Sequence, residues 1–323
     1  MFSKICIITG VLLCLCLSDA HGEEKKGGIA LAFDDGYASW IDTIAPELAK
    51  VGGVATCFVN NQRIHNGYLS FADLLILQNT YGWEIGTHTF HHFNAVEYVE
   101  KNGINDWVKN ELETSVSELK SHDLKILSLV FPFNTFNPEL GDEVLKSLES
   151  FRRASAYPIL DHRNSDGSYN ATSFDSSRFL PLELIYQWID FAHQQDRIVF
   201  LYDHKVLKDE EFFQGIVDSV AGSELVSKNE VKVFGKDDFC LVPDTQRRIY
   251  GNPVAIERIN GKTITTFQSD LPRLTAPGAT FIVGPCYGMP LSYFRKIIDY
   301  ASKKVIFYTV HDALKKLPIS VSP

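Results

Sequence analysis

The stretch GIALAFDDGY, residues 28–37, joins an apolar run directly to two adjacent acids. The run Ile29–Phe33 has the composition of a buried β-strand, and Asp34, Asp35 and Gly36 follow it at once. Asp-Asp-Gly after a strand is also a common turn sequence. In α/β barrels, however, catalytic side chains gather where the strands end, so the position of the two acids indicates a candidate site.

Strand-like runs alternate with helix-like amphipathic stretches between residues 28 and 204. The strand-like runs are GGIALAF, GVATCFV, WEIGT, KILSLVF, RRASAY and RIVFLYDH, and the helix-like stretches cover residues 40–50, 71–79, 105–121 and 138–150. This alternation predicts parallel β-α-β units, and therefore an α/β fold built as an open sheet or as a barrel.

The alternation stops after residue 208, where short β-like runs and turn signals replace it. A helix-like stretch at 292–303 and the run KVIFYTV then resume the earlier pattern. We therefore predict an α/β domain over 27–208, an inserted β-rich domain over 209–288, and the last helix and strand of the first domain, with a tail, over 289–323. The alternative is an independent C-terminal domain. We expect the aromatic residues of the β-rich segment to form its core rather than a platform for sugar stacking; these are Phe234, Phe239, Tyr250, Phe267, Phe281 and Tyr287.

The N-terminus predicts the destination of the chain. One lysine precedes an apolar run over 5–17, and small residues follow it, which is typical of a secretory signal peptide over 1–22. A membrane anchor is the alternative, but the run is short for crossing a bilayer. We expect a secreted, extracellular or periplasmic protein without a membrane span after cleavage. The net charge of −9 argues against nucleic-acid binding.

Three further strand ends carry polar groups. EIGTHTFHH, residues 84–92, ends in His88, His91 and His92; LVFPFNTFNPEL supplies Phe133 and Asn134; and LYDH supplies His204. Imidazole binds divalent metals, and one aspartate with two histidines forms a facial ligand set that leaves positions open for water and substrate. A surface cluster of histidines is the alternative interpretation of the histidine run alone.

These motifs resemble those of the polysaccharide deacetylases with a NodB-homology domain, carbohydrate esterase family 4. Ala32-Phe33-Asp34-Asp35-Gly36 is similar to the first motif of the family, and His88-Thr89-Phe90-His91-His92 is similar to the second. LVFPFNTFNPEL and LYDH resemble the third and fifth motifs. The resemblance covers residues 28–205 with the final helix and strand, and it implies a distorted (β/α) barrel.

The resemblance also implies a role for each site residue. Asp35, His88 and His92 would bind a divalent metal, with zinc favoured over cobalt, manganese or nickel. Asp34 would be the general base that activates the attacking water, and His204 would protonate the departing amine. The third motif would bind the substrate at Phe133 and Asn134, with the backbone N–H of Phe133 facing the oxyanion.

The third motif departs from the family pattern. Many members carry an arginine there that orients the base, and Val130 stands at that position in this chain. Arg153 could replace the missing cation, although a structural ion pair is the simpler interpretation of that residue.

The sequence thus predicts a secreted, metal-dependent hydrolase that removes N-acetyl groups from an amino-sugar polysaccharide. Such an enzyme cleaves a carbon–nitrogen bond that is not a peptide bond, and its partner is the acetylated polysaccharide. An O-acetyl polysaccharide esterase and a non-catalytic carbohydrate-binding protein with the same fold are the alternatives. The complete set of proposed acid, base and ligand residues favours an enzyme over a binding protein.

Overall fold

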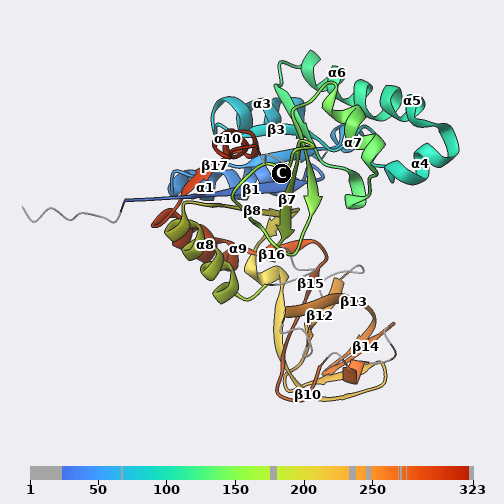
Figure 1. The fold of residues 1–323 in the computed structure, drawn as a ribbon. Coiled ribbons are helices and arrows are strands. Elements are labelled where there is room, and N and C mark those ends of the chain that lie inside the picture. Colours follow the sequence, from blue (N-terminus) through green and yellow to red (C-terminus); the bar gives the residue numbers. More distant parts are fainter. Residues whose placement is uncertain are drawn as a thin grey trace, which may run out of the picture.

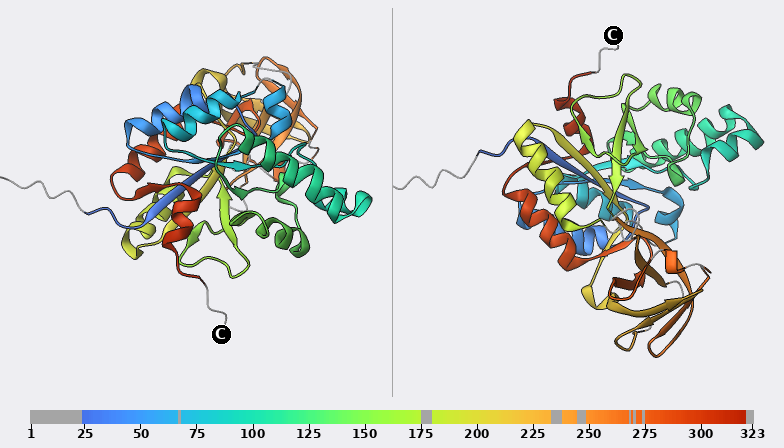
Figure 2. Two further views of the ribbon diagram at one scale, coloured as in Figure 1. Left: turned by 90° about the horizontal axis from the view of Figure 1, so that it is seen from above. Right: turned by 60° about the horizontal axis from the view of Figure 1, so that its bottom comes forward.

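A computed structural model describes residues 24–66, 68–174, 180–232, 238–244, 249–267, 269, 271–273 and 275–319. The predicted signal peptide, 1–22, lies outside these residues. The chain forms an α/β barrel with a smaller, all-β barrel attached on one side, below the larger one in Figure 1. The right-hand view in Figure 2, which is tilted so that the bottom of the molecule comes forward, shows the same arrangement.

Seven parallel strands form the larger barrel. They are β1 (Gly28–Asp34), β2 (Thr56–Val59), β3 (Glu84–Thr87), β4 (Ile126–Leu129), β5 (Ser150–Ala154), β7 (Ser168–Ser173) and β8 (Ile198–Asp203). They pair in this order, and β8 returns to pair with β1, which closes the ring. The predicted (β/α) barrel is therefore confirmed. A short strand, β6 (Ile159–Leu160), adds antiparallel to β8.

The first strand shows how the sequence builds two cores. Its odd-numbered residues, Ile29, Leu31 and Phe33, are buried among the side chains of the surrounding helices. Its even-numbered residues, Ala30 and Ala32, belong to a second cluster inside the barrel. Because side chains alternate between the two faces of a strand, Asp34 lies on the inner face, at the carboxyl end of β1.

Helices cover the outside of the barrel. They are α1 (Ala45–Lys50), α2 (Asn61–His65), α3 (Phe71–Asn79), α4 (Ala95–Asn102), α5 (Ile104–Trp107), α6 (Thr114–Ser121), α7 (Pro138–Leu145), α8 (Leu182–Gln195), α9 (Leu291–Ser302) and α10 (Val310–Lys316). A π-helical turn, Trp40–Ile44, leads into α1, and another, Val108–Glu113, joins α5 to α6. Short 3₁₀ turns occur at Pro132–Asn134, Asp209–Glu211 and Leu271–Arg273.

The β-rich segment forms a closed antiparallel barrel, which we call the small barrel. Its strands are β10 (Phe213–Ala221), β11 (Glu224–Ser227), β12 (Asp238–Asp244), β13 (Ile249–Asn260), β14 (Thr263–Thr266) and β15 (Thr280–Pro285). Phe281 lies in its core, as expected, whereas Phe267 and Tyr287 are exposed to solvent. The side chains of Phe234, Phe239 and Tyr250 lie outside the described residues.

The chain leaves and re-enters the larger barrel at one point. β9 (Lys205–Leu207) leads out towards the small barrel, and β16 (Gly288–Pro290), which leads back, pairs with it in parallel. α9 then packs against α8, with the rings of Tyr186 and Tyr300 stacked 4.0 Å apart. The last strand, β17 (Ile306–Tyr308), pairs in parallel with β1, which is the arrangement expected for an insertion.

Several elements have no counterpart in the sequence-based expectations, among them β7, α8 and α10. β7 has the polar sequence SYNATS, which lacks the apolar run of a typical barrel strand. α8 and α10 are amphipathic helices, and neither was predicted from the sequence pattern. The predicted final strand, KVIFYTV, ends earlier than expected because Thr309 caps α10 by accepting a hydrogen bond from the backbone of Asp312.

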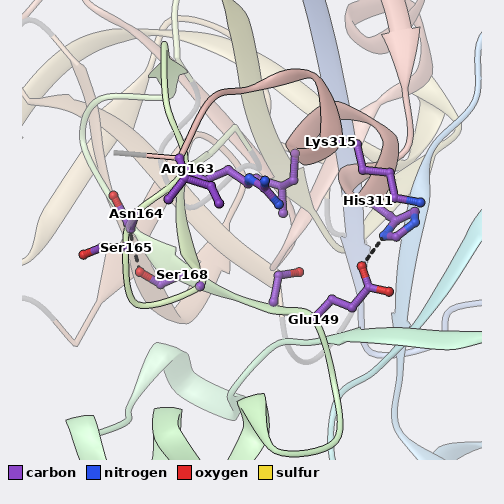
Figure 3. A pocket seen from close by; sticks show the side chains of 11 residues that line it. Glu149, Arg163, Asn164, Ser165, Ser168, His311 and Lys315 are labelled. Atoms are coloured by element: carbon purple, nitrogen blue, oxygen red, sulfur yellow. Dashed lines mark hydrogen bonds and ion pairs between the residues drawn. The ribbon is translucent and has the colours of Figure 1, made fainter. Parts of the chain in front are cut away.

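α10 covers the amino-terminal end of the barrel and packs its apolar side against the residues in the barrel interior. Its apolar residues Val310, Ala313 and Leu314 join the cluster inside the barrel. A cavity of about 130 Å³ lies at this end, between α10 and the loop at 163–168, and Figure 3 shows the side chains that line it. The strand ends that carry the predicted site residues lie at the opposite, carboxyl-terminal end.

A buried carboxylate fixes α10 to the barrel. Glu84 accepts hydrogen bonds from the hydroxyls of Ser128 (2.5 Å) and Thr56 (3.0 Å) and from the backbone N–H of His311 (2.8 Å). The hydroxyl of Thr56 in turn accepts from the backbone N–H of Val310 (2.8 Å). Burial raises the pKa of Glu84. This network is a polar layer at the amino-terminal end of the barrel interior.

No helix among the described residues is both long enough and apolar enough to span a membrane.

We expect Glu84→Ala to lower the free energy of unfolding by about 3 kcal/mol, because it leaves several buried donors without an acceptor. Glu84→Gln keeps one acceptor oxygen and should cost less. Chemical denaturation of the metal-free protein would measure both. A Glu84→Ala variant as stable as the wild type would show that the network does not hold α10.

Candidate functional site

The structure brings Asp35, His88 and His92 together from two strand ends. Asp35 follows β1, and the two histidines lie in the loop after β3. Oδ1 of Asp35 lies 3.1 Å from Nε2 of His92 and 3.5 Å from Nε2 of His88, and the two imidazole nitrogens are 3.2 Å apart. Within the described residues these three form the group whose ligand atoms are close enough to hold one metal ion.

The backbone of the third motif sets the tautomer of His88. Nδ1 of His88 lies 2.7 Å from the carbonyl oxygen of Val130, and a carbonyl can only accept. Nδ1 therefore carries the proton, and the lone pair of Nε2 faces Asp35 and His92. Metal-ligating histidines are commonly fixed in this way by a backbone carbonyl. Val130, which replaces the arginine of the family pattern, thus orients a site residue through its main chain.

The charges of the site favour an ionised acid beside neutral imidazole. Burial alone would raise the pKa of Asp35, but the nearby imidazole of His92 and the charges of His88, His204 and Arg63 hold it well below its usual range. Burial lowers the pKa of His88 to about 4. A carboxylate and a neutral imidazole are the protonation states that bind a divalent cation.

The donor set fits such a cation. Oδ1 of Asp35 is buried and accepts no hydrogen bond of acceptable geometry, although both imidazole nitrogens lie near it. One carboxylate oxygen and two imidazole nitrogens suit zinc and similar metals. The ligand atoms of the three residues all lie within 4.8 Å of one another, so that a single cation could contact all of them.

The neighbouring acid is held differently. Asp34 is buried inside the barrel, where its Oδ1 and Oδ2 accept hydrogen bonds from the two terminal nitrogens of Arg152, at 2.9 and 2.5 Å. Arg152 comes from β5 and is itself buried, with the ring of Tyr202 3.7 Å from its Cζ atom. Burial would lower the pKa of Arg152, but the charge of Asp34 outweighs this and raises it.

The third motif lies between these two groups. The ring of Phe133 meets the ring of His92 edge-on, 4.9 Å away, and is itself largely exposed. Oδ1 of Asn134 accepts a hydrogen bond from Arg152 (3.2 Å), and its amide nitrogen lies 3.4 Å from the hydroxyl of Tyr202. Asn134 therefore supports the arginine that holds Asp34.

A second arginine contacts the other acid. A terminal nitrogen of Arg63, in α2, lies 3.2 Å from Oδ2 of Asp35. The guanidinium lies against the rings of Tyr37 and Tyr68, 5.2 and 5.0 Å from their centres, and these two rings also meet edge-on. Asp35 thus presents Oδ1 to the histidines and Oδ2 to Arg63.

His204 lies at the end of β8, close enough for its charge to lower the pKa of Asp35. Its backbone is fixed on both sides. Its N–H donates to Oδ1 of the buried Asp203 (2.6 Å), and its carbonyl accepts from the indole of Trp40 (2.8 Å). Asp203 therefore shapes the turn that presents His204.

His91 points away from the other histidines. Its Nδ1 lies 2.6 Å from Oε1 of Glu111, and its backbone N–H donates to Oε2 of the same residue. Glu111 is fully buried in the π-helical turn Val108–Glu113, and its carbonyl accepts from the backbone of Phe90. The irregular turn thus anchors the histidine loop, a common use of π-helical turns near functional sites.

Sequence reasoning missed both arginines. Arg153, the cation considered from the sequence, pairs with Asp166, and the adjacent Arg152 contacts Asp34. Alternation along β5 would have separated them, because Phe151 faces the helices and Arg152 must then face the barrel interior. No comparable pattern marks Arg63, whose contact depends on the packing of α2 against the end of β1.

Solved structures with a related fold include three with named activities. A family 4 carbohydrate esterase from Streptomyces lividans shares 14% identity, with 56% of this chain and 80% of that one covered and a TM-score of 0.40. The peptidoglycan deacetylase PdaC from Bacillus subtilis shares 17% identity, with 56% of this chain and 76% of that one covered and a TM-score of 0.35. The CE4 domain of a xylanase from the hindgut metagenome of Trinervitermes trinervoides shares 19% identity, with 55% of this chain and 74% of that one covered and a TM-score of 0.37.

The family assignment does not depend on these structures. No curated protein matches the sequence. The family model described as polysaccharide deacetylase matches residues 21–183, which is just over half of the chain and includes the ends of β1, β3 and β4. The chain therefore belongs to the polysaccharide deacetylase family.

Proposed function

We propose that this deacetylase is a metal-dependent hydrolase that removes N-acetyl groups from an amino-sugar polysaccharide. The observation that carries the proposal is the pairing of two acids with different surroundings. Asp35 faces two imidazole nitrogens, and the adjacent Asp34 is held by Arg152. A protein that only binds sugars would not need two adjacent acids with such different surroundings.

Asp35, His88 and His92 are the residues that would hold the metal. A divalent cation bound there would polarise the acetyl carbonyl and make the attacking water more acidic. Zinc is the metal we favour, because the ligands are two imidazoles and one carboxylate. Since an acetamide is a poor electrophile, such assistance is needed for its hydrolysis.

Asp34 would accept the proton of the attacking water. Its buried ion pair with Arg152 fixes the direction of the carboxylate, because a guanidinium fork holds both oxygens in one plane. In this interpretation Arg152, supported by Asn134, replaces the arginine that is absent from position 130. Arg152 and Asn134 would then be positioning residues.

Arg63 would position the metal ligand in a similar way. Its contact with Oδ2 of Asp35 leaves Oδ1 as the oxygen nearest both histidines. The rings of Tyr37 and Tyr68 hold the guanidinium in place. Each acid of the Asp-Asp pair would therefore have its own arginine.

His204 would donate a proton to the departing amine, which cannot leave as an anion. Its position near Asp35, with its backbone fixed by Asp203 and Trp40, supports this role. The backbone N–H of Phe133 would face the oxyanion, and the exposed ring of Phe133 beside His92 would contact the substrate. We further propose secretion, because residues 1–22 have the pattern of a signal peptide.

The first test measures acetate release from a panel of N- and O-acetylated glycans, with and without a chelator. We expect activity on an N-acetylated glycan that the chelator abolishes and added zinc restores. Release from O-acetylated glycans alone would favour the esterase alternative. Retention of full activity after complete metal removal would contradict metal dependence.

Asp34→Asn and His204→Ala should each lower turnover about 10²–10⁴-fold while metal content stays unchanged, because neither residue is a proposed ligand. His204→Ala should slow amide cleavage more than cleavage of an activated acetate ester, since a phenolate leaves without protonation. Paired kinetics with metal analysis would measure this. Wild-type rates in both variants would show that the base and acid are assigned wrongly.

Arg152→Met should lower the free energy of unfolding by about 3–5 kcal/mol, because it leaves the carboxylate of Asp34 buried without a partner. The double variant Asp34→Asn/Arg152→Met removes that charge and should recover part of the loss. Denaturation of the single and double variants would measure the coupling. If the two losses simply added, the ion pair would not explain the burial of either residue.

Arg63→Met should weaken zinc binding about tenfold, because Asp35 loses the contact that orients it. Arg295→Met, which removes a surface pairing with Glu47 on α1, is the matched control and should leave zinc affinity unchanged. Calorimetric titration with zinc would measure both. Tighter zinc binding by Arg63→Met would show that repulsion between guanidinium and cation outweighs positioning.

A further inference from the structure

A short parallel sheet places one residue of the inserted segment beside His204. His204 precedes β9 and Tyr287 precedes β16, and in the pairing of these strands Gly288 lies opposite Lys205. One step back along both strands, Tyr287 and His204 are therefore neighbours. The centres of their rings are 4.9 Å apart.

This register is firmly set. Met289 and Val206, which lie opposite each other, are both buried, and a slip of one residue would turn Met289 towards the other face. Tyr287 itself has a φ of 57°, in the left-handed region, which is costly for a residue with a side chain. The flanking strands thus hold the tyrosine in a conformation that it would not adopt by itself.

Tyr287 remains 47% exposed although its ring contacts His204. Two other exposed aromatic side chains contact the site. Phe133 is 63% exposed and lies against His92, and Tyr68 is 42% exposed and lies against Arg63. Exposed aromatic rings therefore contact three different residues of the site, namely His92, His204 and Arg63.

We propose that Tyr287 forms a sugar-binding subsite on the His204 side of the site, and that its ligand is a pyranose ring of the glycan substrate. This inference rests on the proposed function. The amine that His204 would protonate stays attached to its sugar, so the sugar must lie on that side. A pyranose ring has an apolar face of C–H groups that packs on an aromatic ring, while the tyrosine hydroxyl can bond to sugar hydroxyls.

The subsite also gives the small barrel a role. Tyr287 lies on the segment that leads from β15 back to the larger barrel, so the insertion delivers this residue to the site. The small barrel would then take part in substrate binding through its junction and not through an aromatic platform on its own surface.

The test is glycan binding, measured by calorimetry on the zinc-loaded Asp34→Asn protein so that turnover does not interfere. The probes are the pentamer of β-1,4-linked N-acetylglucosamine and an acetylated xylo-oligosaccharide. Adding Tyr287→Ala should weaken binding of the better probe about three- to tenfold, whereas Tyr287→Phe should stay within about twofold of the parent, because the ring is kept. Phe267→Ala, which removes an exposed ring from the small barrel, is the control and should leave binding unchanged.

Unchanged affinity in Tyr287→Ala would overturn the proposal. So would an equal loss in Phe267→Ala, which would place the glycan elsewhere on the small barrel, or an absence of binding to both probes. A protein that binds glycan through Tyr287 but releases no acetate in its wild-type form would contradict the proposed function and leave the subsite standing. Thermal unfolding of each variant separates lost binding from lost folding.

Discussion

The buried ion pair between Asp34 and Arg152 is the constraint on which the site depends. Removing two charges from water costs several kcal/mol for each, and only close, well-directed pairing offsets this. The pair joins the carboxyl end of β1 to β5, across the inside of the barrel. The side chains of Ala30 and Ala32, which face the barrel interior on the same strand, are small and leave room there. The ion pair therefore links two strands across the interior of the barrel.

The two acids have adjacent positions in the sequence but opposite surroundings in the structure. Asp34 is on the inner face of β1 and has both oxygens bound by one guanidinium. Asp35 is beyond the strand, in a left-handed conformation, with φ at 85°, that turns its carboxylate towards the histidines. One residue of chain thus separates a carboxylate fixed by a neighbouring cation from one that is available to a metal.

Much of this could be predicted from the sequence, because β1, β3, β4 and β8 combine an apolar run with a polar end. Strand periodicity predicted an α/β sheet or barrel, and the resemblance of the motifs to those of the deacetylase family implied the closed barrel and the grouping of Asp35, His88 and His92. β7 could not be found in this way, since its sequence SYNATS is polar although most of its residues are buried. Arg63 could not be found either, because its contact with Asp35 is set by helix packing, and Tyr287 is brought to His204 only by strand register.

The backbone itself divides the barrel into a regular end and a strained end. Most of the described non-glycine residues with positive φ lie in the loops around the site, namely Asp35, Thr89, His92, Phe133, Asn134 and Tyr287. Such conformations cost about 1–3 kcal/mol each and persist only where the surroundings enforce them. The amino-terminal end, where α10 and the polar layer around Glu84 fill the barrel, supplies that rigidity. A firmly packed lower half therefore lets the upper loops hold acid, imidazole and aromatic groups in conformations that none of these residues favours alone.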